Sequence, residues 1–240
     1  MSVEPYHFSI LQSQTRHAKA ISDIIKLAHG ASVSDTYASC PEVESVCKQI
    51  ATFPEGHLVA VTEIAGQEVV MGVAIAMRTQ RSPHKTSLAW MDMIGDITLV
   101  NHNPKGKWLY GVEMSVRPEF QGHGVGSALY KARFKLVQRL GLRGIYMGGM
   151  LKGYHNYADS LSVEAYAAKV KAGELRDPTV TTQMNRGFEA KDIILKYDEG
   201  DDQAGGTAML LIWDTLKHHQ RPSPQHRTKY QGHKVTQRPL

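Results

Sequence analysis

Apolar residues in the first third of the chain recur at two spacings, which predict helices and strands in alternation. Residues 6–11 form a short apolar run that is typical of a strand. Residues 16–29 follow the period of a helix, about 3.6 residues, and residues 41–52 predict a second helix. Val, Ile and Ala dominate residues 57–64 and 69–77, and an Ala-Gly-Gln turn separates these two runs. The pattern favours an antiparallel hairpin.

The middle of the chain carries a strand, a loop, a helix and a second strand in succession. Alternation over residues 108–116 predicts a strand with one apolar face, made of Trp108, Tyr110, Val112, Met114 and Val116. Glu113 is expected on the opposite face. Residues 125–140 have helical spacing and are followed by Gly141 as a C-cap, and residues 144–151 return as a short strand. The crossover in such a unit is right-handed.

The last third of the chain predicts two more helices and two more strands. Residues 162–172 predict a short extra helix, and Asp177, which precedes a proline, is expected to cap the next helix. Apolar runs at 188–197 and 207–213 predict the strands that complete the sheet. Residues 80–107 are polar and rich in turn residues, so no element is assigned to them.

These elements predict a single domain over residues 1–215, with insertions at about 80–107 and 150–176. Residues 216–240 form a basic tail with six Lys or Arg, four His and no Asp or Glu. Because the tail lacks apolar periodicity, we expect it to be disordered. The rest of the chain has 22 basic and 23 acidic residues, so the net charge of +5 comes from the tail. A nucleic-acid partner is therefore not expected.

The glycine-rich segment 116–127, Val-Arg-Pro-Glu-Phe-Gln-Gly-His-Gly-Val-Gly-Ser, carries the main chemical signal. A glycine turn at a helix N-terminus exposes backbone N–H groups, and such a nest suits a pyrophosphate. A Walker loop requires Lys and then Ser or Thr after its last glycine, whereas Ser127 and Ala128 follow Gly126. A dinucleotide fingerprint requires a glycine at position 127 and an acidic residue where Leu-Arg-Gly stands at 142–144. Neither pattern fits.

The remaining pattern, Val-x-Pro followed by Gln-x-x-Gly-x-Gly, resembles the acyl-CoA loop of the GNAT superfamily of N-acetyltransferases. The resemblance implies an α/β, sandwich-like fold with a mixed, mostly antiparallel seven-stranded sheet flanked by helices. It also implies transfer of an acetyl group from acetyl-CoA, the cosubstrate, to a small-molecule or peptide amine. Loop amides would hold the pyrophosphate, and the preceding strand would bond the pantetheine arm. The binding residues so implied are Met114, Ser115, Val116, Gln121, Gly122, His123, Gly124, Val125, Gly126 and Ser127.

Two further segments narrow the resemblance. Residues 148–158, Gly-Gly-Met-Leu-Lys-Gly-Tyr-His-Asn-Tyr-Ala, and 174–178, Glu-Leu-Arg-Asp-Pro, resemble a bacterial subgroup in which such domains are often fused to nitrilase-like hydrolases. No hydrolase portion follows in this chain, so we expect a stand-alone version. The chain departs from the family's pattern in the last helix, where Gln183 stands at the usual tyrosine position and Arg176 at the usual asparagine.

Glu113 is the best candidate for a general base, because it lies just before the expected thioester site. With an ordinary pKa near 4.3, it would need burial or a water relay, and a structural carboxylate is the alternative. Tyr110 is a weaker candidate. Tyr154 and Tyr157 are candidates to protonate the leaving thiolate, with packing as the alternative. The resemblance points to a backbone N–H near residues 114–116 as the oxyanion donor.

The two cysteines, Cys40 and Cys47, lie away from the glycine-rich motif, so direct attack in a ternary complex is expected rather than an acyl-enzyme. No zinc-like Cys/His spacing is present, and no metal is expected. No leader and no apolar run of about 20 residues is found, so we expect a cytoplasmic protein without membrane contacts. A homodimer is compatible with the sequence.

A second interpretation is a non-catalytic module that binds acyl-CoA and regulates a protein partner, such as a separately encoded hydrolase. The missing asparagine and tyrosine markers favour it, and robust turnover on a defined amine would count against it. An acidic run at 198–202 either draws in a cationic amine or is a solvated loop. The sequence does not identify the acceptor.

Overall fold

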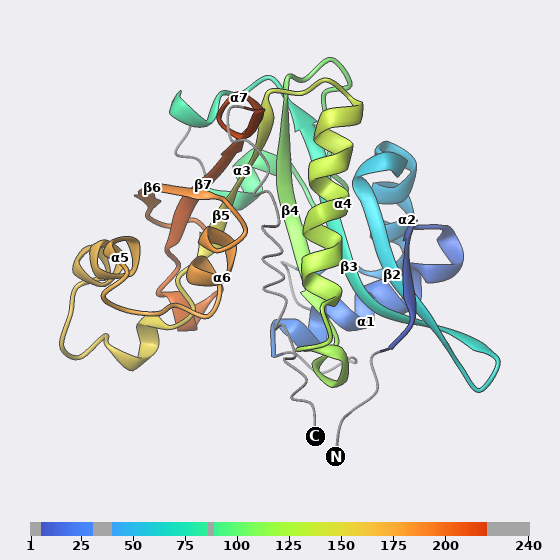
Figure 1. Ribbon diagram of the computed structural model, residues 1–240, viewed down its shortest axis with the longest axis horizontal. Helices are drawn as coiled ribbons and strands as arrows, with labels where there is room; N and C mark the ends of the chain where they lie inside the picture. The colour runs from blue at the N-terminus through green and yellow to red at the C-terminus, as the bar shows by residue number, and fades with distance from the viewer. Residues whose placement is uncertain (1–5, 31–39, 86–88, 220–240) are drawn as a thin grey trace, which may run out of the picture.

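The computed structural model describes residues 6–30, 40–85 and 89–219 of the chain. Its strands form one seven-stranded sheet in the order β1-β2-β3-β4-β5-β7-β6. Strands β4 and β5 pair in parallel, and every other neighbouring pair is antiparallel. The expected mixed, mostly antiparallel α/β sheet is therefore confirmed (Figure 1).

The strands agree closely with the apolar runs of the sequence. They are β1 (Phe8–Gln12), β2 (His57–Ile64), β3 (Gln67–Thr79), β4 (Trp108–Val116), β5 (Gly144–Met150), β6 (Glu189–Ile194) and β7 (Ala208–Asp214). The α-helices are α1 (Ala18–Ala28), α2 (Val43–Thr52), α3 (Trp90–Ile94), α4 (Val125–Arg139), α5 (Val163–Ala172), α6 (Val180–Met184) and α7 (Thr215–His219). Helix α7 occupies the first residues expected in the disordered tail, and residues 220–240 lie outside the described part.

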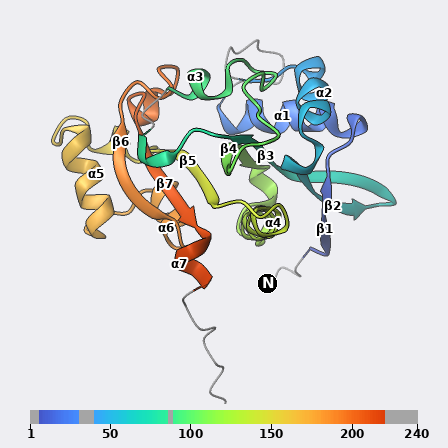
Figure 2. The same cartoon turned by 90° about the horizontal axis from the view of Figure 1, so that it is seen from above.

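The helices cover both faces of the sheet because the buried strands are apolar on both faces. Helices α1 and α2 lie on one side and α4 on the other (Figure 2). The first face buries Ile21, Ile24 and Ile25 of α1 against side chains such as Val73 and Tyr110. The second face buries Leu129 of α4 among residues of β2 and β3. The sheet is thereby shielded from water on both faces.

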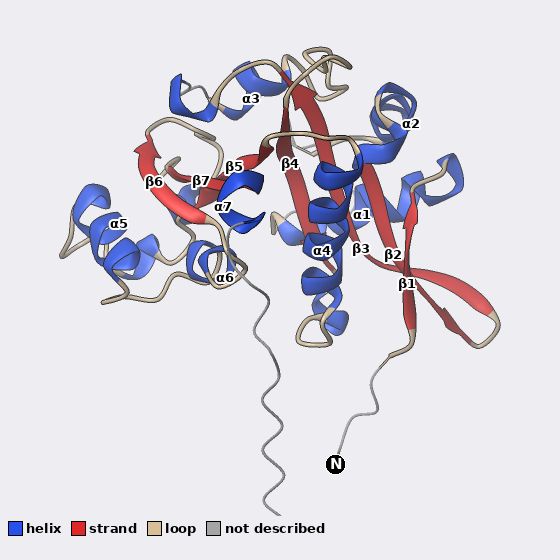
Figure 3. Ribbon diagram, turned by 45° about the horizontal axis from the view of Figure 1, so that its top comes forward, coloured by secondary structure: helices blue, strands red, loops and turns tan. Residues whose placement is uncertain are grey.

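The segment between β5 and β6 contains the predicted extra helix. Ser162 caps α5 by accepting a hydrogen bond from the Ala165 backbone at 3.2 Å. Asp177 is fully buried and accepts hydrogen bonds from the backbone N–H groups of Thr179 and Val180, both at 2.8 Å, at the start of α6. Its other oxygen accepts from Gly153 and Tyr166. Asp177 thus supplies the predicted capping bonds, although the N-cap position is Thr179 and α6 begins two residues after Pro178, and it fastens the segment beside β6 (Figure 3).

A bulge in β4 changes which residues share a face. Ile75 of β3 pairs with Glu113 and the next residue, Ala76, pairs with Gly111, so Val112 is left without a partner. An extra residue of this kind reverses the alternation beyond it. Met114 and Val116 consequently pack on the α4 side, not beside Tyr110 and Val112 as predicted.

None of the described helices combines the length and the apolar composition that a membrane span requires.

Candidate active site

A cavity of about 660 Å³ lies where the two parallel strands of the sheet separate. Their pairing consists of Leu109 with Ile145 and Tyr110 with Tyr146, after which β4 and β5 diverge. Residues of both strands then line the cavity, from Gly111 to Val116 on β4 and at Met147, Gly148 and Met150 on β5. The opening therefore exposes backbone edges of both strands to a ligand.

Arg133 of α4 bridges the bulge from one side of this cavity. Its guanidinium is 1% exposed and donates through Nη2 to the carbonyl of Ile75 at 2.5 Å and to the carbonyl of Glu113. Burial lowers the pKa of Arg133 to about 10, so the group is charged at neutral pH. Since the register breaks between these strands, the guanidinium satisfies carbonyls that flank the break. Arg133 thus stabilises the bulge.

The bulge directs Glu113 toward α1, where its carboxylate meets His29. The distance from His29 Nε2 to Glu113 Oε2 is 3.2 Å. The other oxygen, Oε1, accepts hydrogen bonds from the Met114 N–H and the Ser115 hydroxyl, both at 2.8 Å. The predicted position of Glu113, on the face opposite Tyr110, is therefore wrong because the alternation breaks at Val112. Moreover, the Met114 N–H is already bonded, which leaves fewer candidate oxyanion donors among residues 114–116.

These contacts shift the pKa values of Glu113 and His29 in opposite directions. Burial alone would raise the pKa of Glu113, but the hydrogen bond and charge of His29, with the Ser115 and Met114 donors, lower it to about 2. The hydrogen bond to Glu113 raises the pKa of His29, and burial and Lys152 oppose this change. Glu113 is therefore ionised and weakly basic at neutral pH. His29, which the sequence analysis missed, is the better proton acceptor.

The glycine-rich loop has the open backbone that a phosphate nest requires. Gly122 and Gly124 have φ angles of +81° and +85°, and an added Cβ at either position meets no atom within 4 Å. Gly124 is the N-cap of α4. Of the ten residues expected to bind the cosubstrate, nine line the cavity, and His123 instead packs edge-on against Tyr6. The free space and the helix N-terminus together suit an anion.

Three side chains that the sequence analysis did not assign connect this loop to the interior of the cavity. Arg186 donates from Nη2 to the Ser127 hydroxyl at 3.1 Å, and its guanidinium lies 5.1 Å from the centre of the Tyr130 ring. The Tyr130 hydroxyl accepts a hydrogen bond from Gln183 Nε2 at 3.0 Å. All four residues line the cavity. The arrangement was hidden in the sequence because Gln183 and Arg186 lie far along the chain from the glycine motif.

Tyr154 and Tyr157 lie outside the described lining of the cavity. Their rings pack against Tyr166, with centroids 5.7 and 5.2 Å away, and the Tyr154 hydroxyl donates to the Leu161 carbonyl. Tyr110 is likewise absent from the described lining, and its buried hydroxyl lies 2.6 Å from that of Tyr197, which does line the cavity. The contacts of Tyr154 and Tyr157 fit the packing alternative.

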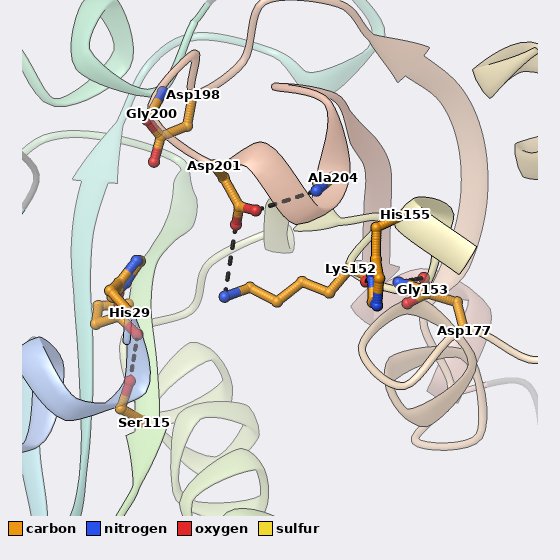
Figure 4. A network of polar contacts seen from close by, with 11 residues as sticks. His29, Ser115, Lys152, Gly153, His155, Asp177, Asp198, Gly200, Asp201 and Ala204 are labelled. Carbon is orange, nitrogen blue, oxygen red and sulfur yellow. Dashed lines mark hydrogen bonds and ion pairs between the residues drawn. The ribbon is translucent and has the colours of Figure 1, made fainter. Parts of the chain in front are cut away.

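Charged groups surround the end of the cavity that holds His29. Lys152, which follows β5, extends toward Asp201 with 3.5 Å between Nζ and Oδ2 (Figure 4). Asp198, in the loop between β6 and β7, lines the cavity near His29 and contributes to raising the pKa of that histidine. Of the acidic run at 198–202, Asp198 therefore reaches the site, while buried Asp201 holds Lys152.

Cys40 lies within electrostatic reach of Glu113, although the sequence places it far from the motif. The thiol is 4% exposed and belongs to the core on the α1 side of the sheet. Burial, reinforced by the charge of Glu113, raises its pKa to about 11. A thiolate nucleophile is therefore disfavoured at this position.

A family model described as "Acetyltransferase (GNAT) family" matches residues 34–155. "Probable hydrolase YhcX" of Bacillus subtilis (strain 168) is 30% identical over 173 residues, which cover 72% of this chain but 33% of YhcX. The chain thus spans about a third of that relative's length. "Uncharacterized N-acetyltransferase YkwB" of the same organism is 28% identical over 173 residues, which cover 72% of this chain and 74% of YkwB.

Among solved structures, "GphF GNAT-like decarboxylase in complex with isobutyryl-CoA" superimposes with a TM-score of 0.66. The match covers 86% of this chain and 98% of the other, at 19% sequence identity. At this identity the comparison establishes a shared fold only. The matches to YhcX and YkwB agree with the expected resemblance to acetyltransferase domains that also occur with hydrolases.

Proposed function

Because the chain belongs to the acetyltransferase (GNAT) family, we propose that it transfers an acetyl group from acetyl-CoA to an amine by direct attack in a ternary complex. The observation that carries the proposal is the continuous cavity that joins an open glycine nest at the start of α4 to the paired His29 and Glu113. One end suits a pyrophosphate and the other suits proton transfer. The fold of an acyl-CoA-bound neighbour supports a CoA thioester as the donor.

On the donor side, the exposed amides of residues 121–127 would bind the pyrophosphate, assisted by the guanidinium of Arg186 beside Ser127. Residues 114–116 of β4 would bond the pantetheine arm through their backbone, because β5 has diverged from them at this level. The thioester would then lie near the bulge. His29 faces this region from α1 and Tyr130 faces it from α4.

His29 would accept the proton that the amine loses as its nitrogen attacks the thioester carbon. Glu113 would hold the imidazole in orientation and stabilise the imidazolium that forms, while remaining ionised itself. The carbon–sulfur bond then breaks, and the sulfur needs a proton. Since Gln183 donates to the Tyr130 oxygen, the hydroxyl proton of Tyr130 is directed elsewhere and is available for the sulfur. Tyr130 and Gln183 would thus take over the role of the tyrosine that the family pattern has at position 183, in α6.

Replacement of Tyr130 by phenylalanine is expected to lower kcat by about 10- to 100-fold, since water would replace a positioned general acid. The ring, its contact with Phe188 and its stacking with Arg186 are retained, so the KM for acetyl-CoA should stay within about threefold. Steady-state kinetics of the two enzymes would measure this split. Phe134→Leu, which alters a neighbouring packing residue, serves as the control. An unchanged kcat in Tyr130→Phe would exclude Tyr130 as the proton donor to the sulfur.

The reaction itself is tested by following release of the CoA thiol with acetyl-CoA and a broad panel of amines, with a known acetyltransferase as positive control. We expect thiol release that depends on both substrates, and mass spectrometry should find an acceptor heavier by one acetyl group. Tight CoA binding without turnover, accompanied by co-purification of one protein, would instead favour the non-catalytic regulatory module.

A further inference from the structure

The two ends of the cavity differ in charge. Arg186 lies toward the glycine-rich loop, whereas the buried Arg133 reaches the bulge and bonds the carbonyl of Glu113. Glu113, Lys152 and Asp198 lie toward His29, and Lys152 is joined to Asp201. With His29 neutral, as a base must be, this second end holds three carboxylates, the ammonium of Lys152 and the guanidinium of Arg133. The excess of one negative charge disfavours an acceptor that brings a carboxylate of its own.

Pairing of these charges leaves one carboxylate over. Glu113 is hydrogen-bonded to His29 and has the Arg133 guanidinium at its carbonyl, and Asp201 is paired with Lys152. Asp198 accepts one hydrogen bond through Oδ1 from the Gly200 backbone at 3.2 Å, and within residues 6–30, 40–85 and 89–219 it forms no ion pair. Figure 4 shows Asp198 and His29 on the same side of the Lys152–Asp201 contact. The unmatched carboxylate therefore borders the end of the cavity where the proposed base lies.

The reacting nitrogen cannot be the group that Asp198 holds, because an ammonium held as a cation has no lone pair for attack. A carboxylate at this point is useful if the acceptor carries a second, non-reacting positive charge. We propose that the acceptor is a diamine or longer oligoamine, whose one amine reacts beside His29 while another, as an ammonium, binds Asp198. This inference rests on the proposed acetyl transfer and specifies its substrate class.

The test uses three amines of equal chain length: 1,4-diaminobutane, butylamine and 4-aminobutyrate. Their tails end in an ammonium, a methyl group and a carboxylate, so they isolate the charge that Asp198 would meet. The kcat/KM of each is measured by thiol release at saturating acetyl-CoA, and diamines of three and five carbons are included to cover the spacing. We expect the best diamine to exceed butylamine by about 10- to 100-fold, as for one charge-assisted hydrogen bond, and 4-aminobutyrate to be the poorest.

Asp198→Asn keeps the shape of the side chain and removes its charge. The ratio of kcat/KM for diaminobutane to that for butylamine is expected to fall to within about threefold of one. Glu199→Gln is the matched control, because it makes the same charge change at the adjacent residue, whose side chain is 72% exposed and lies outside the described lining. Its ratio should equal that of the wild type. Circular dichroism and thermal melting would verify that both variants fold.

The outcomes separate this inference from the function on which it rests. If butylamine and the diamines are acetylated at similar rates by the wild type, acetyl transfer stands and the diamine inference is overturned. The same holds if Asp198→Asn leaves a high ratio unchanged. If calorimetry detects CoA binding but no amine releases thiol, the proposed function fails and the substrate class fails with it. Because the comparison of diamines with butylamine uses the wild-type protein, it can overturn the inference even if a variant folds poorly.

Discussion

His29→Gln is expected to lower kcat/KM for the best amine by about 10²- to 10⁴-fold, the range typical of a lost general base. Glutamine can still occupy the space beside Glu113 and donate a hydrogen bond to it, but it cannot accept a proton. His29 lines the cavity and meets Glu113 at 3.2 Å, so the loss should appear in catalysis and not in CoA affinity. Thiol release and calorimetry with CoA would measure the two effects on one preparation.

His84→Gln is the appropriate control, because it replaces an exposed histidine outside the described lining of the cavity. Its kinetics should match those of the wild type. If His29→Gln retained kcat/KM within about threefold, His29 would be excluded as the base, and a direct role for Glu113 would have to be considered despite its lowered pKa.

The pH dependence of kcat/KM provides an independent readout of the pair. The base must be neutral, and the pKa of His29 is raised above the ordinary value of about 6.5 by its hydrogen bond to Glu113. Activity should therefore rise with pH through that raised pKa. Lys152 opposes the rise in the pKa of His29 and Asp198 assists it, so both groups affect the pH at which this increase in activity, the acid limb of the profile, occurs. Glu113→Gln removes the carboxylate that raises the pKa of His29 and leaves the burial that lowers it, so the acid limb should move to lower pH.

The same pair links pH to folding. His29 has a raised pKa when folded, so its contribution to stability is full below its unfolded pKa and is lost as pH rises through the folded pKa. Glu113 has a lowered pKa, so its contribution is present above its unfolded value near 4.3 and is lost as pH falls toward about 2. The pair therefore stabilises the fold most between the unfolded pKa of Glu113, near 4.3, and the unfolded pKa of His29, near 6.5. Base catalysis instead needs a pH above the raised pKa of His29 in the folded protein.

Local patterns in the sequence predicted the elements of the proposed donor side, because these elements depend on neighbouring residues. The strand at 108–116 agrees with β4 at both ends, since period-two alternation is decided by adjacent residues. The glycines at 122, 124 and 126 indicated the nest through their spacing after Val-x-Pro, between a strand and a helix, and Asp177 indicated the start of α6 through its capping chemistry. Each of these signals lies within a few residues of the feature that it predicts.

The proposed acceptor side depends on contacts between distant segments, and the sequence did not indicate most of them. His29 meets Glu113 across 84 positions of the sequence, and Gln183 meets Tyr130 across 53. Apolar periodicity does not encode such polar pairs. The bulge at Val112 is equally hidden, because strict alternation continues through it in the sequence while Arg133 stabilises the break from another element. Buried Arg133 in an amphipathic helix was the one available signal, because a charge on an apolar face requires nearby acceptors.

Gly126→Leu is expected to weaken CoA binding by at least about 100-fold, because it fills the space in front of the loop amides. Gly126 lies in the first turn of α4 with no positive φ angle, and an added Cβ would have its nearest contact at 3.9 Å, with Val116. The backbone therefore accepts a side chain here, unlike at Gly124, whose φ of +85° strains any other residue. Loss of two charge-assisted hydrogen bonds of about 1.5–3 kcal/mol each accounts for the expected factor.

A graded series separates this steric effect from an effect on folding. Gly126→Ala should raise the melting temperature by about 2–4 °C, since alanine is favoured over glycine in a helix by about 1 kcal/mol, and should weaken CoA binding less than leucine does. Gln138→Leu adds the same side chain at an exposed position in the last turn of α4 and should leave affinity unchanged. Calorimetry with CoA measures all three. If Gly126→Leu melts at or above the wild-type temperature and still binds CoA with wild-type affinity, the nest at the start of α4 is not the pyrophosphate site.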